Sequence, residues 1–85
     1  MATYRILYWQ EVPSQVRAED DHDEVTLPLD GRFMERIDRL ASERGLGGSD
    51  DYLAQWHWSD DLHRDGSAGD VAAAVKAEIE AERPA

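Results

Sequence analysis

The chain has no cysteine, a single lysine and a single phenylalanine among its 85 residues. The absence of cysteine excludes disulfides, thiolate metal sites and cysteine nucleophiles. No apolar run approaches the roughly 18 residues that a membrane-spanning helix needs. The first residues also lack the basic and apolar pattern of a secretory signal. The sequence contains neither a glycine-rich phosphate loop nor the spacing of a Ser/His/Asp triad. We therefore expect a cytoplasmic, non-enzymatic protein without a cofactor.

Basic residues are scarce relative to acidic ones. The sequence has 19 acidic and 9 basic residues and a net charge of −10, and eight of the nine basic residues are arginine. Such a surface repels phosphate backbones and anionic membranes, so neither nucleic acid nor a membrane is the expected partner. The acidity fits either adaptation to a salty cytoplasm, where screening weakens self-repulsion, or a basic partner. The length corresponds to one domain, residues 1–85.

The first third of the chain predicts a sheet over residues 3–29. Residues 3–10 are rich in aromatic and β-branched types and carry apolar side chains on both faces. Pro13 favours a sheet edge or a bulge. Two half-buried strands of period two follow, separated by a polar turn at Asp20–Asp23. The alternating apolar positions are Val16 and Ala18 in one strand and Val25, Leu27 and Leu29 in the next.

The first helix-start signal is Asp30, which is a good N-cap residue. We predict helices over about 30–45, 49–58 and 68–82, with a loop over 59–69. Gly45 and Leu46 fit a Schellman ending of the first helix, and Ser49 is the expected cap of the second. Apolar residues define the buried face of the first helix at Phe33, Met34, Ile37, Leu40 and Ala41. The expected fold is therefore α+β, with a three-stranded, mainly antiparallel sheet packed on one face by about three helices.

Two groups of side chains are candidates for function. His57, Asp61 and His63 form a two-histidine, one-carboxylate set of the kind that binds iron or zinc, provided that the second helix continues through them. Exposed polar loop residues are the alternative interpretation.

The second group is a proposed contact surface. A single helical layer covers one face of a sheet, so the other apolar face of residues 3–10 must meet water, a second subunit or a partner. Trp and Tyr are common interface anchors. The predicted partner-binding residues are Tyr8, Trp9, Gln10 and Arg32. The alternative is that Trp9 lies in a closed core beneath the C-terminal helix.

Residues 25–55 also imitate a ribbon-helix-helix repressor, with a period-two strand followed by two helices. In such dimers, the outward residues of the strand read the major groove. Here these residues are Glu24, Thr26 and Pro28, and an acid and a proline are poor groove readers. A degenerate regulator of this kind is a third alternative.

Several short motifs occur together in a defined order. They are Tyr8-Trp9, Val12-Pro13-Ser14-Gln15-Val16, Val25, Leu27-Pro28, Arg32-Phe33, Ile37-Asp38, Gly45-Leu46 and Asp51-Tyr52-Leu53-Ala54-Gln55-Trp56. Over residues 3–56, this pattern resembles the small "virulence factor" domain family. The lack of catalytic motifs and the uncovered apolar face predict a non-enzymatic accessory or protein-interaction module that binds a protein partner or itself, with a small metal- or ligand-binding protein as the alternative. The resemblance further suggests an accessory to one-carbon (folate or corrinoid methyl-transfer) enzymes.

Overall fold

The computed structural model describes residues 1–46 and 50–81. Its sheet has five strands in the order β3-β2-β1, with β4 and β5 both pairing with the remaining edge of β1, and every pairing is antiparallel. The bounds are β1 Ala2–Trp9, β2 Val12–Glu19, β3 Glu24–Pro28, β4 Trp56–Trp58 and β5 Leu62–Arg64. The α+β class is confirmed, and the three strands predicted within residues 3–29 are all present. The expected total of three strands is too low.

Strands β4 and β5 behave as one edge strand with a bulge. Leu7 pairs with Trp58, whereas Tyr4 pairs with Leu62, so the register shifts by one residue between them. Ser59 bridges the gap: its N–H donates to the Ile6 carbonyl at 2.8 Å, and its Oγ accepts from the Ile6 N–H at 2.9 Å. Because a bulge shifts the alternation of faces by one residue, even-numbered residues lie on one face of the sheet before Ser59 and on the other face after it.

A second bulge lies in β2 next to Pro13. Leu7 pairs with Gln15 and Tyr8 pairs with Pro13, which leaves Ser14 as the extra residue. Its carbonyl accepts a hydrogen bond from Leu29 N–H at 3.0 Å, so the backbone group remains satisfied. The bulge expected at Pro13 is therefore confirmed, and it brings Val12 opposite Trp9.

Helix α1 covers Gly31–Glu43 and begins and ends as its sequence predicts. The Asp30 carboxylate accepts from Arg32 N–H at 3.3 Å, and Gly45 adopts a φ of 69°. The Leu46 N–H donates to the Ala41 carbonyl at 2.8 Å and the Gly45 N–H to the Ser42 carbonyl at 3.2 Å. These two bonds form the expected Schellman motif.

The helix predicted over 49–58 is wrong beyond its first turns. Helix α2 covers only Asp50–Ala54, and the next residues form β4. The alternating aromatic residues of 56–58 fit a strand, and the free edge of β1 supplies their backbone partners. The 59–69 segment, expected to be a loop, contains β5 for the same reason. The predicted cap Ser49 lies outside the described residues.

Helix α3 covers Ala68–Ala81 and packs on one face of the sheet. Residue 82, the predicted end, lies outside the described residues. The Asp20 carboxylate joins this helix to the β2–β3 turn. One oxygen accepts from Ala68 N–H at 2.8 Å, and the other accepts from His22 and Asp23 N–H, each at 2.7 Å. These hydrogen bonds, led by that of Ala68, lower the pKa of Asp20 to about 2.

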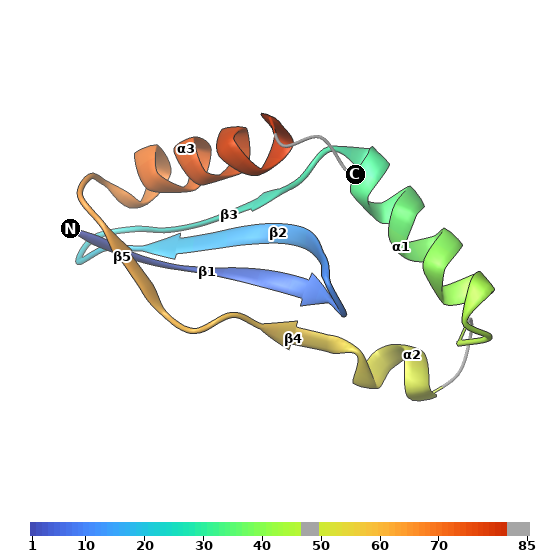
Figure 1. Ribbon diagram of the computed structural model, residues 1–85. Coiled ribbons are helices and arrows are strands. Elements are labelled where there is room, and N and C mark those ends of the chain that lie inside the picture. Colours follow the sequence, from blue (N-terminus) through green and yellow to red (C-terminus); the bar gives the residue numbers. More distant parts are fainter. Residues whose placement is uncertain (47–49, 82–85) are drawn as a thin grey trace.

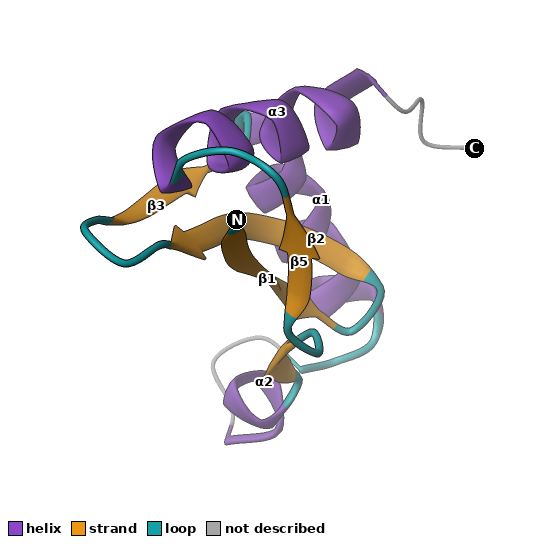
Figure 2. Ribbon diagram, turned by 90° about the vertical axis from the view of Figure 1, so that its left-hand side faces the viewer, coloured by secondary structure: helices purple, strands orange, loops and turns teal. Residues whose placement is uncertain are grey.

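The core consists of two adjacent clusters. The first lies between α3 and the sheet and includes Ile6, Val16, Val71 and Val75. The second lies where α1 crosses the end of β1 and β2, and it is built from Trp9, Val12, Ile37 and Ala41. Figures 1 and 2 show α3 along one side of the sheet, α1 across its end and α2 beyond β4. The prediction that all the helices pack on one face of the sheet is therefore wrong.

Candidate functional site

The sheet has a face that lies opposite α3, which we call the open face. Its side chains belong to alternate residues of neighbouring strands. Leu7 pairs with Gln15 of β2 on one side and with Trp58 of β4 on the other. Helix α1 reaches Trp9 and Val12 at one end of this side of the sheet, and these two residues are buried. The half-buried or exposed residues of the face include Thr3, Arg5, Leu7, Gln15, Arg17, Thr26 and Trp58.

Trp58 is the tryptophan of the open face that is exposed, with 39% of its surface accessible to solvent. The Arg5 guanidinium carbon lies 5.3 Å from the centroid of the Trp58 ring, which is within cation–π range. Arg5 Nε also lies 3.4 Å from a carboxylate oxygen of Asp61. The Arg5 guanidinium therefore lies over the Trp58 ring, and its contact with Asp61 helps to fix it there.

A second arginine flanks this patch. Arg17 lies directly opposite Arg5 on the neighbouring strand, and like charges in this position repel. Glu24 lies 2.7 Å from the Arg17 guanidinium, and this contact raises the pKa of Arg17. Among the described residues, Arg17 Nε has no hydrogen-bond partner although it is buried. The apolar centre formed by Leu7 and Trp58 is therefore bordered by two opposite-charge pairs.

The predicted contact residues do not form one surface. Trp9 is fully buried, and its Nε1–H donates to the Tyr52 carbonyl at 3.0 Å. It is a core residue because α1, rather than the C-terminal helix, covers its end of the sheet. An exposed contact surface therefore excludes the Trp9 indole.

Of the other three predicted contact residues, Tyr8 and Gln10 both contact His57, whereas Arg32 lies on another element. Tyr8 is half-buried and stacks on His57, with ring centroids 5.7 Å apart. Gln10 lies in the β1–β2 turn and donates to Gln55 at 3.1 Å. Arg32 belongs to α1 and donates to the Glu80 carbonyl of α3.

The proposed metal ligands are not brought together. His57 pairs with Tyr8 and His63 with Thr3, which are five residues apart on β1 and so separated by about 17 Å. The bulge at Ser59 also places the two histidines on opposite faces of the sheet. His57 donates to the Gln10 carbonyl at 2.9 Å, Asp61 pairs with Arg5, and His63 bonds to Thr3 Oγ1 at 3.2 Å. Within residues 1–46 and 50–81, no group of three potential ligands could hold a metal ion.

The ribbon-helix-helix arrangement also differs from what is observed. Its strand would be β3, which here pairs with β2 of the same chain, and its second helix would be α2, which has only five residues. Both differences have the same cause: β3 pairs with β2, and residues soon after Ala54 pair with β1 as β4 instead of extending the helix.

Sequence reasoning missed Trp58, Leu7 and Arg5 as members of one surface. Trp58 was assigned to a helix, so its position beside Leu7 could not be derived. The signal that could have revealed it is the large–polar–large alternation of residues 56–58, which is typical of a strand.

Comparison with known proteins identifies the family. Residues 7–85 match the family model described as "Virulence factor", so the chain belongs to that family, as its motifs suggested. No curated protein and no solved structure matches the chain. None of the helices in the described part of the chain has the length and apolarity required to cross a bilayer.

Proposed function

We propose that this chain is a non-enzymatic protein-interaction module and that its contact surface is the open face of the sheet. The single observation that carries the proposal is the exposed Trp58, which lies beside Leu7 under the Arg5 guanidinium. Tryptophan and arginine are the side chains most enriched among residues that dominate binding energy at protein interfaces.

The composition of the open face supports a protein as the partner. Leu7 and Trp58 form a small apolar centre, and the Arg5–Asp61 and Arg17–Glu24 pairs border it. An apolar centre with a polar rim is the usual anatomy of a protein–protein contact. The acidic composition favours a protein over nucleic acid or an anionic membrane. We expect this interaction in the cytoplasm.

The narrower proposal is that the partner is an enzyme of one-carbon metabolism. It rests on the family resemblance alone, and no residue of the open face selects such a partner by its chemistry. Self-association through the same face is the alternative, because an apolar patch on one copy can meet the same patch on another.

The test compares two substitutions of exposed apolar residues. The immobilised chain and its Trp58→Thr and Leu53→Ala variants are incubated with lysate, and a protein captured by the wild type is then purified. Leu53 is 65% exposed on α2, outside the strands that form the open face, so it provides the control. Trp58 lies outside both core clusters, so its variant should fold, which circular dichroism checks.

We expect Trp58→Thr to weaken binding of the purified partner by about 30-fold or more in calorimetric titration, which corresponds to about 2 kcal/mol. Leu53→Ala should bind like the wild type. An Arg5→Gln variant should also bind more weakly, since the cation over the indole is removed. Equal binding by the wild type, Trp58→Thr and Arg5→Gln would refute the proposed surface. Sedimentation of the wild type and Trp58→Thr distinguishes self-association.

A further inference from the structure

The positive charges of the chain are unevenly paired. Eight lysine and arginine side chains are described, and five of them lie within 4.0 Å of a carboxylate: Arg5, Arg17, Arg44, Arg64 and Lys76. The described cations without such a carboxylate are Arg32, Arg36 and Arg39. In a chain of net charge −10, carboxylates are abundant, so three neighbouring arginines without one are unexpected.

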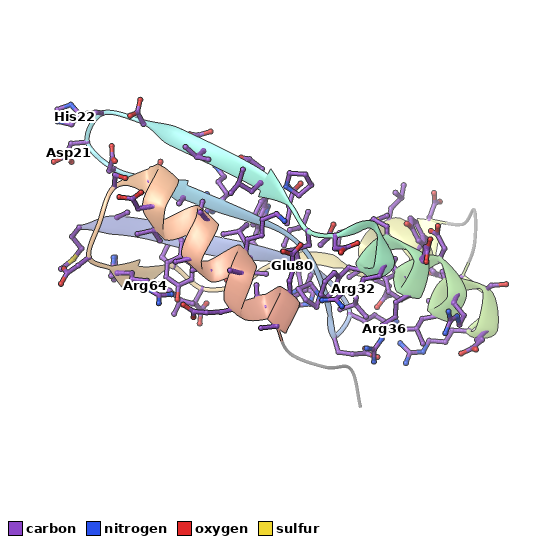
Figure 3. The ribbon with its side chains drawn as sticks, turned by 90° about the horizontal axis from the view of Figure 1, so that it is seen from above. Asp21, His22, Arg32, Arg36, Arg64 and Glu80 are labelled. Atoms are coloured by element: carbon purple, nitrogen blue, oxygen red, sulfur yellow. The ribbon has the colours of Figure 1, made fainter. Side chains whose placement is uncertain are left out.

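These three arginines line one groove on α1. They are spaced at i, i+4 and i+7, so they follow one face of the helix over about 10 Å. The groove has a volume of about 480 Å³, and Phe33 and Leu40 contribute its apolar wall. The Arg32 guanidinium carbon lies 5.1 Å from the Phe33 ring centroid. Figure 3 shows Arg32 and Arg36 on the same side of α1, near Glu80 of α3.

The position of these charges is unfavourable for the helix itself. Helix α1 has no acidic residue in its first turn and no basic residue in its last turn. An isolated helix is stabilised by the reverse arrangement, because its N-terminus carries partial positive charge. Arg32 adds to the positive potential at that end, while the Asp30 and Glu80 carboxylates partly offset it, so the three arginines supply the positive charge that suits an anionic ligand.

Nearby carboxylates form their ion pairs and shortest hydrogen bonds with other groups, although Glu11 also attracts Arg36 at longer range. Glu11, in the β1–β2 turn, bonds to Arg44 at 3.0 and 3.4 Å, and this contact is the main cause of its lowered pKa. Glu80 bonds to Lys76 at 2.7 Å and to Asp30 N–H at 2.7 Å. Glu35 and Glu43 also line the groove, and Glu43 follows Arg39 by about one helical turn.

We propose that this groove binds an acidic segment of a partner protein, at a site separate from the open face. Carboxylates one helical turn apart on the segment would match the spacing of the three arginines, and apolar side chains next to them would contact Phe33 and Leu40. The apolar wall favours a peptide over a polyphosphate, which offers no apolar side chains.

The test measures fluorescence anisotropy with a labelled helical peptide that carries Glu at i, i+4 and i+7 and Leu at i+1 and i+8. A matched peptide carries Gln in place of Glu. The proteins compared are the wild type, Arg36→Gln, Arg39→Gln and Arg64→Gln. Arg64 pairs with Glu78 on α3, so its variant makes the same charge change away from the groove.

We expect the wild type to bind the Glu peptide and each groove variant to bind it about tenfold more weakly, with Arg64→Gln unchanged. Molar salt should weaken binding, because the Debye length falls from about 10 Å at 0.1 M to about 3 Å at 1 M. An Arg36→Glu/Arg39→Glu variant should instead prefer a peptide with Lys in place of Glu.

Five results would overturn the proposal, and four of them come from the binding measurements. They are equal affinity for the Glu and Gln peptides, an unchanged affinity in both groove variants, no measurable binding, and tighter binding of duplex DNA through the same arginines. Arg36-dependent self-association of the unmixed protein would assign the groove to a second copy and would also overturn it. Arg39 is exposed, so its variant tests the groove even if Arg36→Gln does not fold.

Discussion

Replacing Trp9 tests the arrangement of the core more directly than any other substitution. The side chain is fully buried and packs against Val12, Ile37 and Ala41. Burial of roughly 200 Å² at about 25 cal/mol/Å² gives about 5 kcal/mol, and aromatic-to-alanine substitutions in cores cost about 3–5 kcal/mol. A domain of 85 residues has roughly 4–13 kcal/mol of total stability. Trp9→Ala should therefore unfold much of the population or lower the melting temperature by more than about 10 °C.

Urea denaturation followed by circular dichroism measures this effect. Trp9→Phe provides an intermediate, because it keeps an aromatic ring but removes the hydrogen bond to Tyr52, which is worth about 1 kcal/mol. Leu53→Ala is the control for an exposed apolar residue and should change stability by about 0.5 kcal/mol or less. If Trp9→Ala cost under about 1 kcal/mol, the assignment of Trp9 to the core would be refuted.

Three further predictions concern charge and packing. The pKa of Asp20 is lowered to about 2, so its contribution to stability is present above the unfolded pKa near 4 and is lost as pH falls from about 4 to 2; Asp20→Asn should flatten the acid melting curve in this window, and an unchanged curve would contradict the link to Ala68. Ile37→Ala should cost about 2–5 kcal/mol in urea denaturation, whereas Met34→Ala, at a position 38% exposed, should cost far less, and equal costs would place α1 wrongly. Raising potassium chloride to molar concentration should raise the melting temperature, because screening reduces repulsion at a net charge of −10, and a flat or falling melting temperature would reject this explanation.

Elements that carry local signals were predictable from the sequence. Period-two alternation defined β2 and β3, Asp30 marked the start of α1, and Gly45 with Leu46 marked its end. Each of these signals acts within a few residues, so it survives without knowledge of the fold.

The candidate site depends on contacts that the sequence does not reveal. Trp58 reaches Leu7 only because β4 pairs with β1, and these two residues are separated by most of the chain. Trp9 and Trp58 cannot be distinguished as core and surface until the path of α1 across the sheet is known. The spacing of Arg32, Arg36 and Arg39 on one helix face can be derived from the sequence. Their lack of carboxylate partners cannot, because it depends on where the fold places the carboxylates.

The late position of β4 and β5 in the sequence has a consequence for synthesis of the chain. Strand β1 emerges from the ribosome before β4 and β5, so one of its two edges is paired only when residues 56–64 have been made. Until then, backbone groups of β1 beside Leu7 and Trp9 stay unpaired, and such an edge can pair with another nascent chain. Closing so long a loop is also slower than forming the β1–β2 hairpin. Chains that terminate before Trp56 should therefore aggregate, whereas chains that include residues 56–64 cover this edge with their own strands.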